Sequence, residues 1–474
     1  MSTTLHTGTT ATRGWLPEAA RDREREILEQ AEGRGAQWLA TRIDALAHRN
    51  RVIHELECIN LNPATNVMNP HAEAILASGL SSRPSLGYPG AKYEMGLEAI
   101  EEIEVLAASL ARQVFAADYA EVRVASGAIA NAYAFMATCS PGDPIIVPPE
   151  TIGGHATHHP QGVAGLLGLE IHEAPADRAH YSVDLAGLAA LAQRVRPRLI
   201  TIGSSLNLEP HPVDAIRRIA DDTGARVLFD AAHVSGLVAG GVWPNPLDQG
   251  ADLMTMSTYK SLGGPAGGLV LTNDGTLAER VEAIAYPGMT ANFDVAKTAA
   301  LAIGLLDWLD FGPAYATAMV ATARALASAL EDLRLPVFKT STGSTTSHQF
   351  ALDAREFGGG HEAAVRLREA NILSCAIGLP NQPAMTGLRL GTPEIVRWGM
   401  DSAHMTTLAD LIGRALRCNP SDLADEVTEF RRRFTTLRYM RSMTDPRAPD
   451  GDPRQPTETA GDGRTNHRGD PHGT

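Results

Sequence analysis

Cysteine is scarce in this chain of 474 residues, which holds four: Cys58, Cys139, Cys375 and Cys418. They are scattered along the chain without the short paired spacing that zinc sites need, so no metal is expected. A chain of this length also does not need disulfides to build a core. These features exclude a small disulfide-built secreted domain, and we expect reduced thiols in a cytoplasmic protein.

Long apolar runs and an excess of positive charge are missing as well. No apolar run is long enough to cross a bilayer, and the first ten residues lack the basic and apolar regions of a signal peptide. The formal net charge of -14 disfavours nucleic acid and anionic membranes as partners. We therefore expect small-molecule partners, and a length typical of a large α/β domain joined to a smaller one.

The stretch from residue 227 to residue 268 carries the strongest chemical signal. Apolar runs at 227–229 and 253–256 predict two strands, and Asp230 and Lys260 follow near their carboxyl ends, where open α/β sheets bind ligands. Small residues and glycines around Lys260 allow a planar group to approach its amine, as a Schiff-base lysine requires. An acid on the neighbouring strand suits the ring nitrogen of a pyridoxal cofactor. A solvated turn lysine and a helix-capping aspartate would give the same spacing.

The identity of the residues in this stretch favours a pyridoxal cofactor over the turn lysine and capping aspartate. They read F-D-A-A-H-V-S-G-L-V-A-G-G-V-W-P-N-P and then S-T-Y-K-S-L-G-G-P-A-G-G-L, and they resemble the serine hydroxymethyltransferase family of pyridoxal 5'-phosphate (PLP) enzymes. The resemblance extends from about residue 53 to about residue 434. It implies the aspartate-aminotransferase-like α/β fold (fold type I), in which a large mixed-sheet domain binds PLP and a smaller α/β domain follows.

Four parts are expected along the chain: a helical arm over 1–70, a large PLP-binding domain over 71–305, a small C-terminal domain over 306–441 and a disordered tail over 442–474. Periodic apolar residues predict a long amphipathic helix between residues 17 and 57, and two long helices between 298 and 333. The tail is rich in Pro, Gly, Asp, Arg and Thr, which bury little apolar surface. In the family the arm wraps a second subunit, so the resemblance implies a homodimer or a dimer of dimers with shared active sites.

The resemblance also implies a catalytic set. Lys260 would hold the cofactor, and Asp230 would pair with its ring nitrogen. His155, in G-G-H-A-T-H, falls on a family histidine that lies over the ring and assists proton movements. The two glycines before it leave an imidazole room to lie flat on an aromatic plane.

Further positions correspond to the rest of the cofactor site. Ser126, Gly127 and Ala128 form a turn before a predicted helix, and such a turn presents N–H groups to a phosphate. Ser205 and His233 match family residues near the cofactor, whereas Tyr259 and Thr290 stand where the family pattern is changed, and Thr290 or Asn292 is expected to take over an anion contact there. Tyr259 replaces the histidine that usually precedes the lysine, and Thr290 lies in a loop that reaches the partner's phosphate in the family.

Three residues are expected to bind the substrate. Arg389 falls on the family arginine that grips the substrate carboxylate, and a planar guanidinium suits a carboxylate because it donates two parallel hydrogen bonds. An arginine in a strand that is apolar on both sides also needs an anionic partner. Tyr93 is kept from a tyrosine pair of the family, and Asn62 can donate hydrogen bonds near the substrate, although turn chemistry before Pro63 explains it equally well.

The chain departs from the family pattern at positions around the same site. Leu86 stands where the family has the glutamate that serves folate-dependent transfer, and an isobutyl group cannot move a proton. Pro84 and Glu94 replace tyrosines, and Ala266 replaces an arginine. Leu61 or its neighbour stands where a serine is usual. Because Lys260, Asp230 and His155 are kept, these changes indicate altered chemistry and not decay.

The sequence therefore predicts a PLP-dependent enzyme that cleaves or forms the Cα–Cβ bond of a β-hydroxy-α-amino acid. We expect a folate-independent aldolase or transaldolase that acts on an amino acid and an aldehyde, with threonine, serine or an α-substituted serine as the amino acid. Three alternatives stay open. One is a folate-dependent serine or α-methylserine hydroxymethyltransferase in which Glu94 replaces the missing acid. The others are different chemistry at Cα, such as transamination, racemisation or decarboxylation, and a non-catalytic PLP-binding protein.

Overall fold

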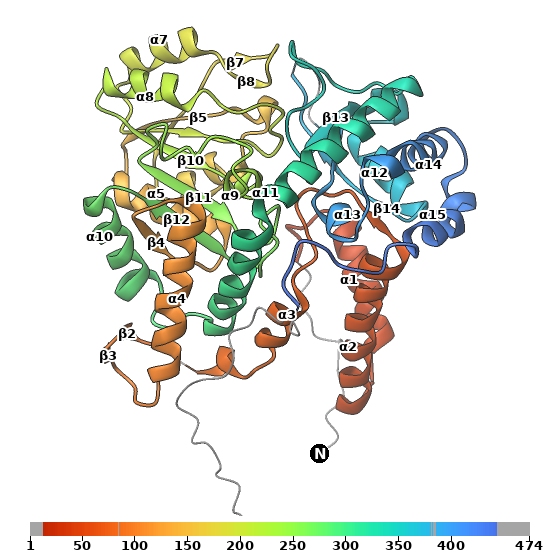
Figure 1. Cartoon of the computed structure of the whole chain (residues 1–474), viewed down its shortest axis with the longest axis horizontal. Coiled ribbons are helices and arrows are strands. Elements are labelled where there is room, and N and C mark those ends of the chain that lie inside the picture. Colours follow the sequence, from red (N-terminus) through yellow and green to blue (C-terminus); the bar gives the residue numbers. More distant parts are fainter. Residues whose placement is uncertain (1–12, 84, 381, 383–384, 443–474) are drawn as a thin grey trace, which may run out of the picture.

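The computed structural model describes residues 13–83, 85–380, 382 and 385–442 of the chain. Pro84 lies outside the described residues, and so does the predicted tail apart from Ser442. The described chain is a mixed α/β protein built around one large mixed sheet (Figure 1). Among these residues no helix combines the length and the apolar character that crossing a membrane requires.

The large sheet has seven strands, in the spatial order β4 (Tyr119–Glu121), β12 (Gly268–Thr272), β11 (Leu253–Ser257), β10 (Arg226–Asp230), β9 (Leu199–Ile202), β5 (Pro144–Val147) and β6 (Glu170–Glu173). The run from β11 to β6 is parallel, whereas β12 and β4 pair antiparallel at one edge. The two strands predicted before Asp230 and Lys260 are confirmed. They are neighbours, with Asp230 opposite Thr255.

Both faces of this sheet are apolar, because helices cover each side. Along β10, Leu228 belongs to the core on one face, whereas Val227 and Phe229 belong to the core on the other. The Leu228 face is covered by α5 (Gly127–Thr138) and α10 (Gly275–Ala283). The opposite face packs on α4 (Glu98–Phe115), α7 (Leu185–Val195), α8 (Val213–Asp221) and α11 (Val295–Asp332).

Shorter elements complete this part of the chain. They are α3 (Pro70–Leu76), α6 (Val163–Leu166), α9 (Ser235–Ala239), the hairpin β2 (Gly87–Tyr88) and β3 (Ala91–Lys92), and the pair β7 (Ala176–Asp177) and β8 (Ser182–Val183). Three 3-10 turns are η2 (Leu80–Ser82), η3 (Glu150–Ile152) and η4 (Ala156–His158), and η5 (Ile284–Met289) is a π turn.

The C-terminal part has a three-stranded antiparallel sheet in the order β13 (Gln349–Asp353), β16 (Gly387–Gly391) and β15 (Cys375–Ile377). Beside it, β14 (Ile372–Leu373) pairs in parallel with β1 (Ile59–Asn60), so the N-terminal segment joins this part. Its helices are α12 (Gly360–Glu369), α13 (Pro393–Arg397), α14 (Met405–Arg417) and α15 (Ala424–Arg431), with 3-10 turns η6 (Ala354–Phe357), η7 (Ser402–His404) and η8 (Pro420–Leu423).

Two predictions about helices are wrong in detail. The arm is not one helix, because Gly33 takes a left-handed φ of 68° and separates α1 (Glu18–Ala31) from α2 (Ala36–Arg51), which continues into the π turn η1 (Val52–Glu57). Conversely, the two helices expected between 298 and 333 are the single helix α11. It passes through Pro313, where the face around Leu309 is exposed and water can satisfy the carbonyl that proline leaves unpaired.

The predicted boundaries at 70/71 and 305/306 stay predictions. At the second one, α11 runs without a break from the large sheet towards the C-terminal part (Figure 1). The two arm helices bury no residue and lie away from the large sheet in the same view. Exposed apolar side chains on them include Ile43 and Leu46. The arm therefore leaves apolar surface for another molecule to cover.

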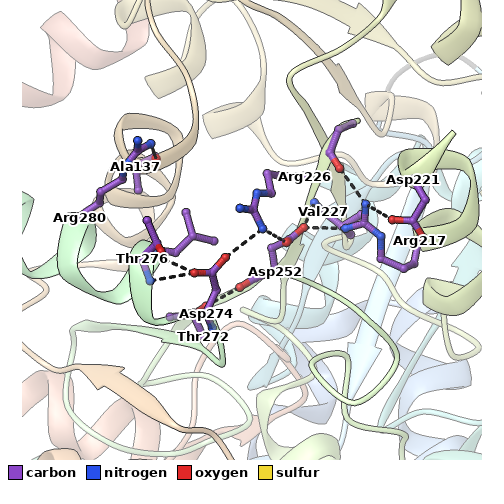
Figure 2. Close-up of polar contacts among 12 residues, drawn as sticks. Ala137, Arg217, Asp221, Arg226, Val227, Asp252, Thr272, Asp274, Thr276 and Arg280 are labelled. Atoms are coloured by element: carbon purple, nitrogen blue, oxygen red, sulfur yellow. Dashed lines mark hydrogen bonds and ion pairs between the residues drawn. The ribbon is translucent and has the colours of Figure 1, made fainter. Parts of the chain in front are cut away.

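One carboxylate ties together the amino ends of the central strands. Asp252, just before β11, accepts hydrogen bonds from Arg217 at 2.7 Å, from Arg226 at 2.5 Å and from the Val227 N–H at 2.7 Å. Figure 2 shows Asp252 between the two arginines, with Asp274 contacting Arg226 from its other side. Because Asp252 is mostly buried, this network fixes β10 against β11 at the end opposite the functional residues.

Replacing Asp252 tests this network. Asp252→Asn keeps the size of the side chain but leaves two arginines without their shared charge, so we expect the midpoint of thermal unfolding to fall by about 3 °C or more. Differential scanning calorimetry measures it. Asp214→Asn removes an exposed helical pair with Arg218 and should leave the midpoint unchanged. Equal midpoints for all three proteins would contradict the assigned role of Asp252.

Candidate functional site

Nine of the residues predicted for the site line one cavity of about 150 Å³ at the carboxyl ends of β9, β10 and β11. They are Ser126, Gly127, Ala128, His155, Ser205, Asp230, His233, Tyr259 and Lys260. Asn131, Gly203, Ser204, Ala232 and Ser257 complete the lining. Strand ends, a helix start and two loops therefore converge on one place, as expected for an open α/β sheet.

Asp230 is a buried carboxylate that the surrounding structure holds in its charged form. Burial alone would raise its pKa, but hydrogen bonds and charge from His158 and Asn131 hold the pKa well below the ordinary value. The Asn131 amide donates to Oδ2 at 2.8 Å, and His158 Nε2 lies 3.1 Å from the same oxygen. Oδ1 accepts only the Ala232 N–H among the described residues, at 2.9 Å. Asp230 therefore keeps acceptor capacity for a cationic ring nitrogen.

Lys260 is the buried amine of the cavity, with 6% of its surface exposed. Burial lowers its pKa to about 8, and Arg389 lowers it further while Asp230 opposes the shift. Nζ lies 3.0 Å from His233 Nε2, and burial together with Lys260 holds the pKa of His233 well below the ordinary value. A neutral imidazole can accept a hydrogen bond from this amine. The amine is therefore close to its reactive neutral form at ordinary pH.

His155 is a second neutral imidazole in the cavity. Burial lowers its pKa, against the attraction of Asp230. Its Nδ1 accepts the Thr157 N–H at 3.3 Å and lies 2.9 Å from the Thr157 hydroxyl. These contacts with the 3-10 turn η4 fix the orientation of the ring. Gly154 precedes it at a place where a Cβ would meet the Pro148 carbonyl oxygen at 2.0 Å. The glycines therefore set the path that brings His155 into the cavity.

The amino end of α5 forms the other side of the cavity. Ser126 caps this helix by accepting the Ile129 N–H at 3.2 Å, while the earlier N–H groups of the first turn point towards the cavity end of the helix. A Cβ at Gly127 would lie 2.2 Å from the Ser257 hydroxyl oxygen. A larger residue at this close approach between α5 and β11 would displace the Ser257 hydroxyl from its present position. The helix start therefore offers N–H groups, a positive dipole end and hydroxyls to an anion.

Arg389 reaches the cavity from the C-terminal part. It lies on β16 and is buried, and Nη1 donates to the Ser205 carbonyl oxygen on the cavity rim. Its Nε and Nη2 lie 3.3 and 3.2 Å from the sulfur of Cys375, which in turn lies 3.3 Å from Asn62 Oδ1. The predicted substrate residues Arg389 and Asn62 are therefore joined through one thiol. Among the described residues, no carboxylate forms a hydrogen bond or an ion pair with this guanidinium.

Two predicted residues lie away from the cavity of their own chain. Thr290 lines a neighbouring cavity behind the α5 start, and its hydroxyl donates to the Ala285 carbonyl at 2.6 Å. Tyr93 follows the β2–β3 hairpin and is 80% exposed, because the buried ion pair of Lys92 with Glu104 holds the hairpin on α4. Tyr88 of the hairpin packs edge-on against Tyr286 at 5.6 Å, so both segments lie together.

The substituted family positions fall in three environments. Leu86 is half-buried at the hairpin base, where its carbonyl accepts the Tyr93 N–H at 3.1 Å. Glu94 is also half-buried, and its Oε2 has no partner among the described residues. Ala266 is exposed, and Leu61 lies in the apolar core. The Leu61 side chain therefore contributes to packing and has no polar contact with the site.

Sequence reasoning missed three polar residues that complete the site. Asn131 lies on α5 and links Asp230 to the Thr255 hydroxyl, which donates to it at 2.6 Å. His158 ends the G-G-H-A-T-H segment and contacts Asp230, and Cys375 contacts Arg389. His158 could have been predicted, because it is the second histidine of a segment already singled out for the site. A buried helix asparagine and a strand cysteine give no such signal, because their partners are remote in sequence.

The chain is similar to several known proteins. The model of the family described as serine hydroxymethyltransferase matches residues 42–412. An α-methylserine aldolase of Variovorax paradoxus is 58% identical over 431 residues, which cover 90% of this chain and 98% of that protein. One of Ralstonia sp is 53% identical over 434 residues, 90% of this chain and 99% of the relative. A serine hydroxymethyltransferase of Staphylothermus marinus is 37% identical over 390 residues, 81% and 89% of the two chains.

The lowered pKa of Lys260 predicts a pH dependence of its reactivity. Only the neutral amine attacks a carbonyl, so reductive methylation of Lys260 by formaldehyde and cyanoborohydride in the cofactor-free protein should rise with pH and level off above about 8. Because Asp230 raises this pKa, Asp230→Asn should move the midpoint to lower pH. Peptide mass spectrometry measures the rate. A rate that is still rising steeply between pH 9 and 10 would contradict the assignment.

Proposed function

The chain belongs to the serine hydroxymethyltransferase family, and from this premise we propose that it is an α-methylserine aldolase. The reaction breaks the Cα–Cβ bond of α-methylserine and yields alanine and formaldehyde without tetrahydrofolate. This reaction is the folate-independent aldolase reaction that the sequence predicted. One observation carries the proposal: a buried amine of lowered pKa and a buried ionised acid share a cavity, and at its rim lies a guanidinium whose hydrogen bonds go to a thiol and a backbone carbonyl and not to a carboxylate.

The residues of the cavity fit PLP. The buried Asp230 suits a pyridinium nitrogen, Lys260 suits an aldehyde, and the α5 start with Ser126 and Ser257 suits a phosphate. The absence of a side chain at Gly127 lets the Ser257 hydroxyl lie against the α5 start. When bound, PLP supplies an electron-poor ring that stabilises negative charge at Cα.

Arg389 orients the substrate. Its guanidinium grips the α-carboxylate, and Asn62 adds a polar contact on the same side. By fixing the carboxylate, Arg389 would fix the orientation of the other bonds at Cα and so determine which of them is aligned for cleavage when PLP is bound. For α-methylserine it is the bond to the hydroxymethyl carbon.

Two groups handle the protons. The hydroxyl of the substrate loses its proton as the Cα–Cβ bond electrons move to Cα, and the neutral imidazole of His155, which lines the cavity, accepts that proton and passes it to the amine of Lys260. Cα then gains a proton, which the amine of Lys260 supplies. The sum is α-methylserine to alanine plus formaldehyde, with no oxidant or reductant consumed.

The folate-dependent alternative is disfavoured by Leu86. The base of the hairpin carries an isobutyl group where a proton-transferring acid is needed for folate chemistry. Glu94 is the nearest acid in sequence, and it lies beyond the exposed Tyr93 on the same segment. The experiment on folate described below separates the two reactions.

We propose a homodimer, or a dimer of dimers, with shared active sites and the two-domain division of fold type I enzymes. The β2–β3 hairpin and the segment from 286 to 290 lie together and expose Tyr93, Met95 and Met289. The arm helices expose a second apolar surface. Both surfaces suit a second copy of the chain, because Tyr93 and Thr290 do not reach their own cavity. The cytoplasmic location stays a prediction.

Product analysis tests the reaction. Purified protein with PLP and α-methylserine should release formaldehyde and alanine in equal amounts, and tetrahydrofolate should leave the rate unchanged. Lys260→Ala should lower kcat by about 10⁴-fold or more, because the covalent attachment and the proton donor are lost. Formation of alanine only in the presence of tetrahydrofolate, with the one-carbon unit recovered on the folate and not as free formaldehyde, would favour the hydroxymethyltransferase instead. Absence of either product would contradict both.

Hybrid dimers test the shared sites. Lys260→Ala and Tyr93→Ala chains, coexpressed with different tags and purified through both, should recover about half of the wild-type activity, because one of the two sites carries neither change. Wild-type chains with the same two tags are the control. If each site is built within one chain, the hybrid is no more active than the average of its two parents.

A further inference from the structure

Cys375 and Arg389 are direct partners across two strands. Cys375 begins β15 and pairs with Arg389 in the antiparallel register with β16, so both side chains emerge on the same face of the sheet. The sulfur lies 3.3 Å from Nε and 3.2 Å from Nη2 of the guanidinium. Two N–H donors on one edge of the Arg389 guanidinium therefore contact the same sulfur atom.

This contact leaves part of the guanidinium available. Arg389 has five N–H donors. Two point to the sulfur and one, on Nη1, to the Ser205 carbonyl oxygen. The two remaining N–H groups have no hydrogen-bond partner in the described part of the chain, and two are sufficient to hold a carboxylate through both oxygens.

Asn62 fixes the sulfur from the other side. Its Oδ1 lies 3.3 Å from the Cys375 sulfur and also accepts the Ala64 N–H at 3.0 Å. Its own N–H donates to Asn60 Oδ1 at 3.0 Å, and the Asn60 amide donates to the buried Glu394 at 2.7 Å. The thiol is therefore held between a guanidinium and an amide that is itself anchored in the core.

We propose that Cys375 is a positioning residue for the substrate carboxylate. It holds one edge of Arg389 so that the remaining N–H groups face the cavity. This inference rests on the proposed function, since it assumes that Arg389 binds the carboxylate of an amino acid.

The weakness of sulfur as an acceptor explains why a thiol suits this position. A carboxylate at residue 375 would form a two-point ion pair with Arg389 and compete with the substrate. An alanine would leave the guanidinium free to adopt other rotamers, which weakens a grip that depends on geometry. A thiol aligns the arginine without neutralising it.

Variants at residue 375 test this positioning. Cys375→Ala should raise KM for α-methylserine about tenfold with a smaller fall in kcat, because ground-state binding of the carboxylate is lost first. Cys375→Asp should raise KM by about 100-fold, and Cys375→Ser should restore most of the affinity. Cys418→Ala changes an exposed thiol outside the cavity and should match the wild type.

Alkylation of the unmodified enzyme gives a readout that needs no substitution. In the PLP-loaded protein, alanine at ten times its Kd should slow the reaction of Cys375 with iodoacetamide about tenfold. The amino alcohol 2-aminopropan-1-ol lacks the carboxylate and should not protect. Cys418 is an internal reference whose rate should not change. Peptide mass spectrometry follows each thiol.

The outcomes separate this inference from the proposed function. If wild-type enzyme cleaves α-methylserine but Cys375→Ala and Cys375→Asp keep KM within about twofold, the positioning role is wrong and the aldolase stands. Equal alkylation of Cys375 with and without bound alanine, when cofactor absorbance shows alanine bound, also overturns it. If the wild type cleaves no α-methylserine, the proposed function fails, whereas protection of Cys375 by carboxylates would still support the grip of Arg389.

Discussion

The buried negative charge of Asp230 is the interaction on which the rest of the site depends. A carboxylate that is 8% exposed is stable as an anion only because an amide, an imidazole and a backbone N–H surround it. These partners come from α5, from the 3-10 turn η4 and from the end of β10. The same charge therefore fixes the position of α5 and of the 3-10 turn η4, which follows His155.

Much of the fold could be predicted from the sequence, because its strands are short apolar runs with small residues after them. The two strands before Asp230 and Lys260 follow that pattern. The prediction of one long helix in the arm was wrong, because the left-handed φ of Gly33 ends a helix that periodicity alone would continue. Between residues 298 and 333 two helices were predicted and one is present, since the exposed helix face at Pro313 tolerates a missing N–H. Periodicity records which residues are apolar, and it does not record where solvent can replace a hydrogen bond.

The site was predictable where chemistry follows a strand end and resemblance supplies the role. Lys260, Asp230 and His155 meet in one cavity, as their positions after strands and glycines suggested. Asn131 was missed because its partners Asp230 and Thr255 are about a hundred residues away. Cys375 was missed because its contact with Arg389 depends on the register of two strands. Such contacts depend on tertiary structure, and a single sequence does not specify them.

The guanidinium of Arg389 comes from a different sheet from the amine and the acid of the cavity. Its link to the large sheet is the Ser205 carbonyl, a backbone group that no side-chain substitution removes. If Arg389 binds the substrate carboxylate as proposed, mutations in β15 and β16 can alter which acids bind while Asp230 and Lys260 on the large sheet stay untouched. Natural variation or laboratory selection has a route to new amino-acid preferences that leaves the chemical core of the enzyme intact.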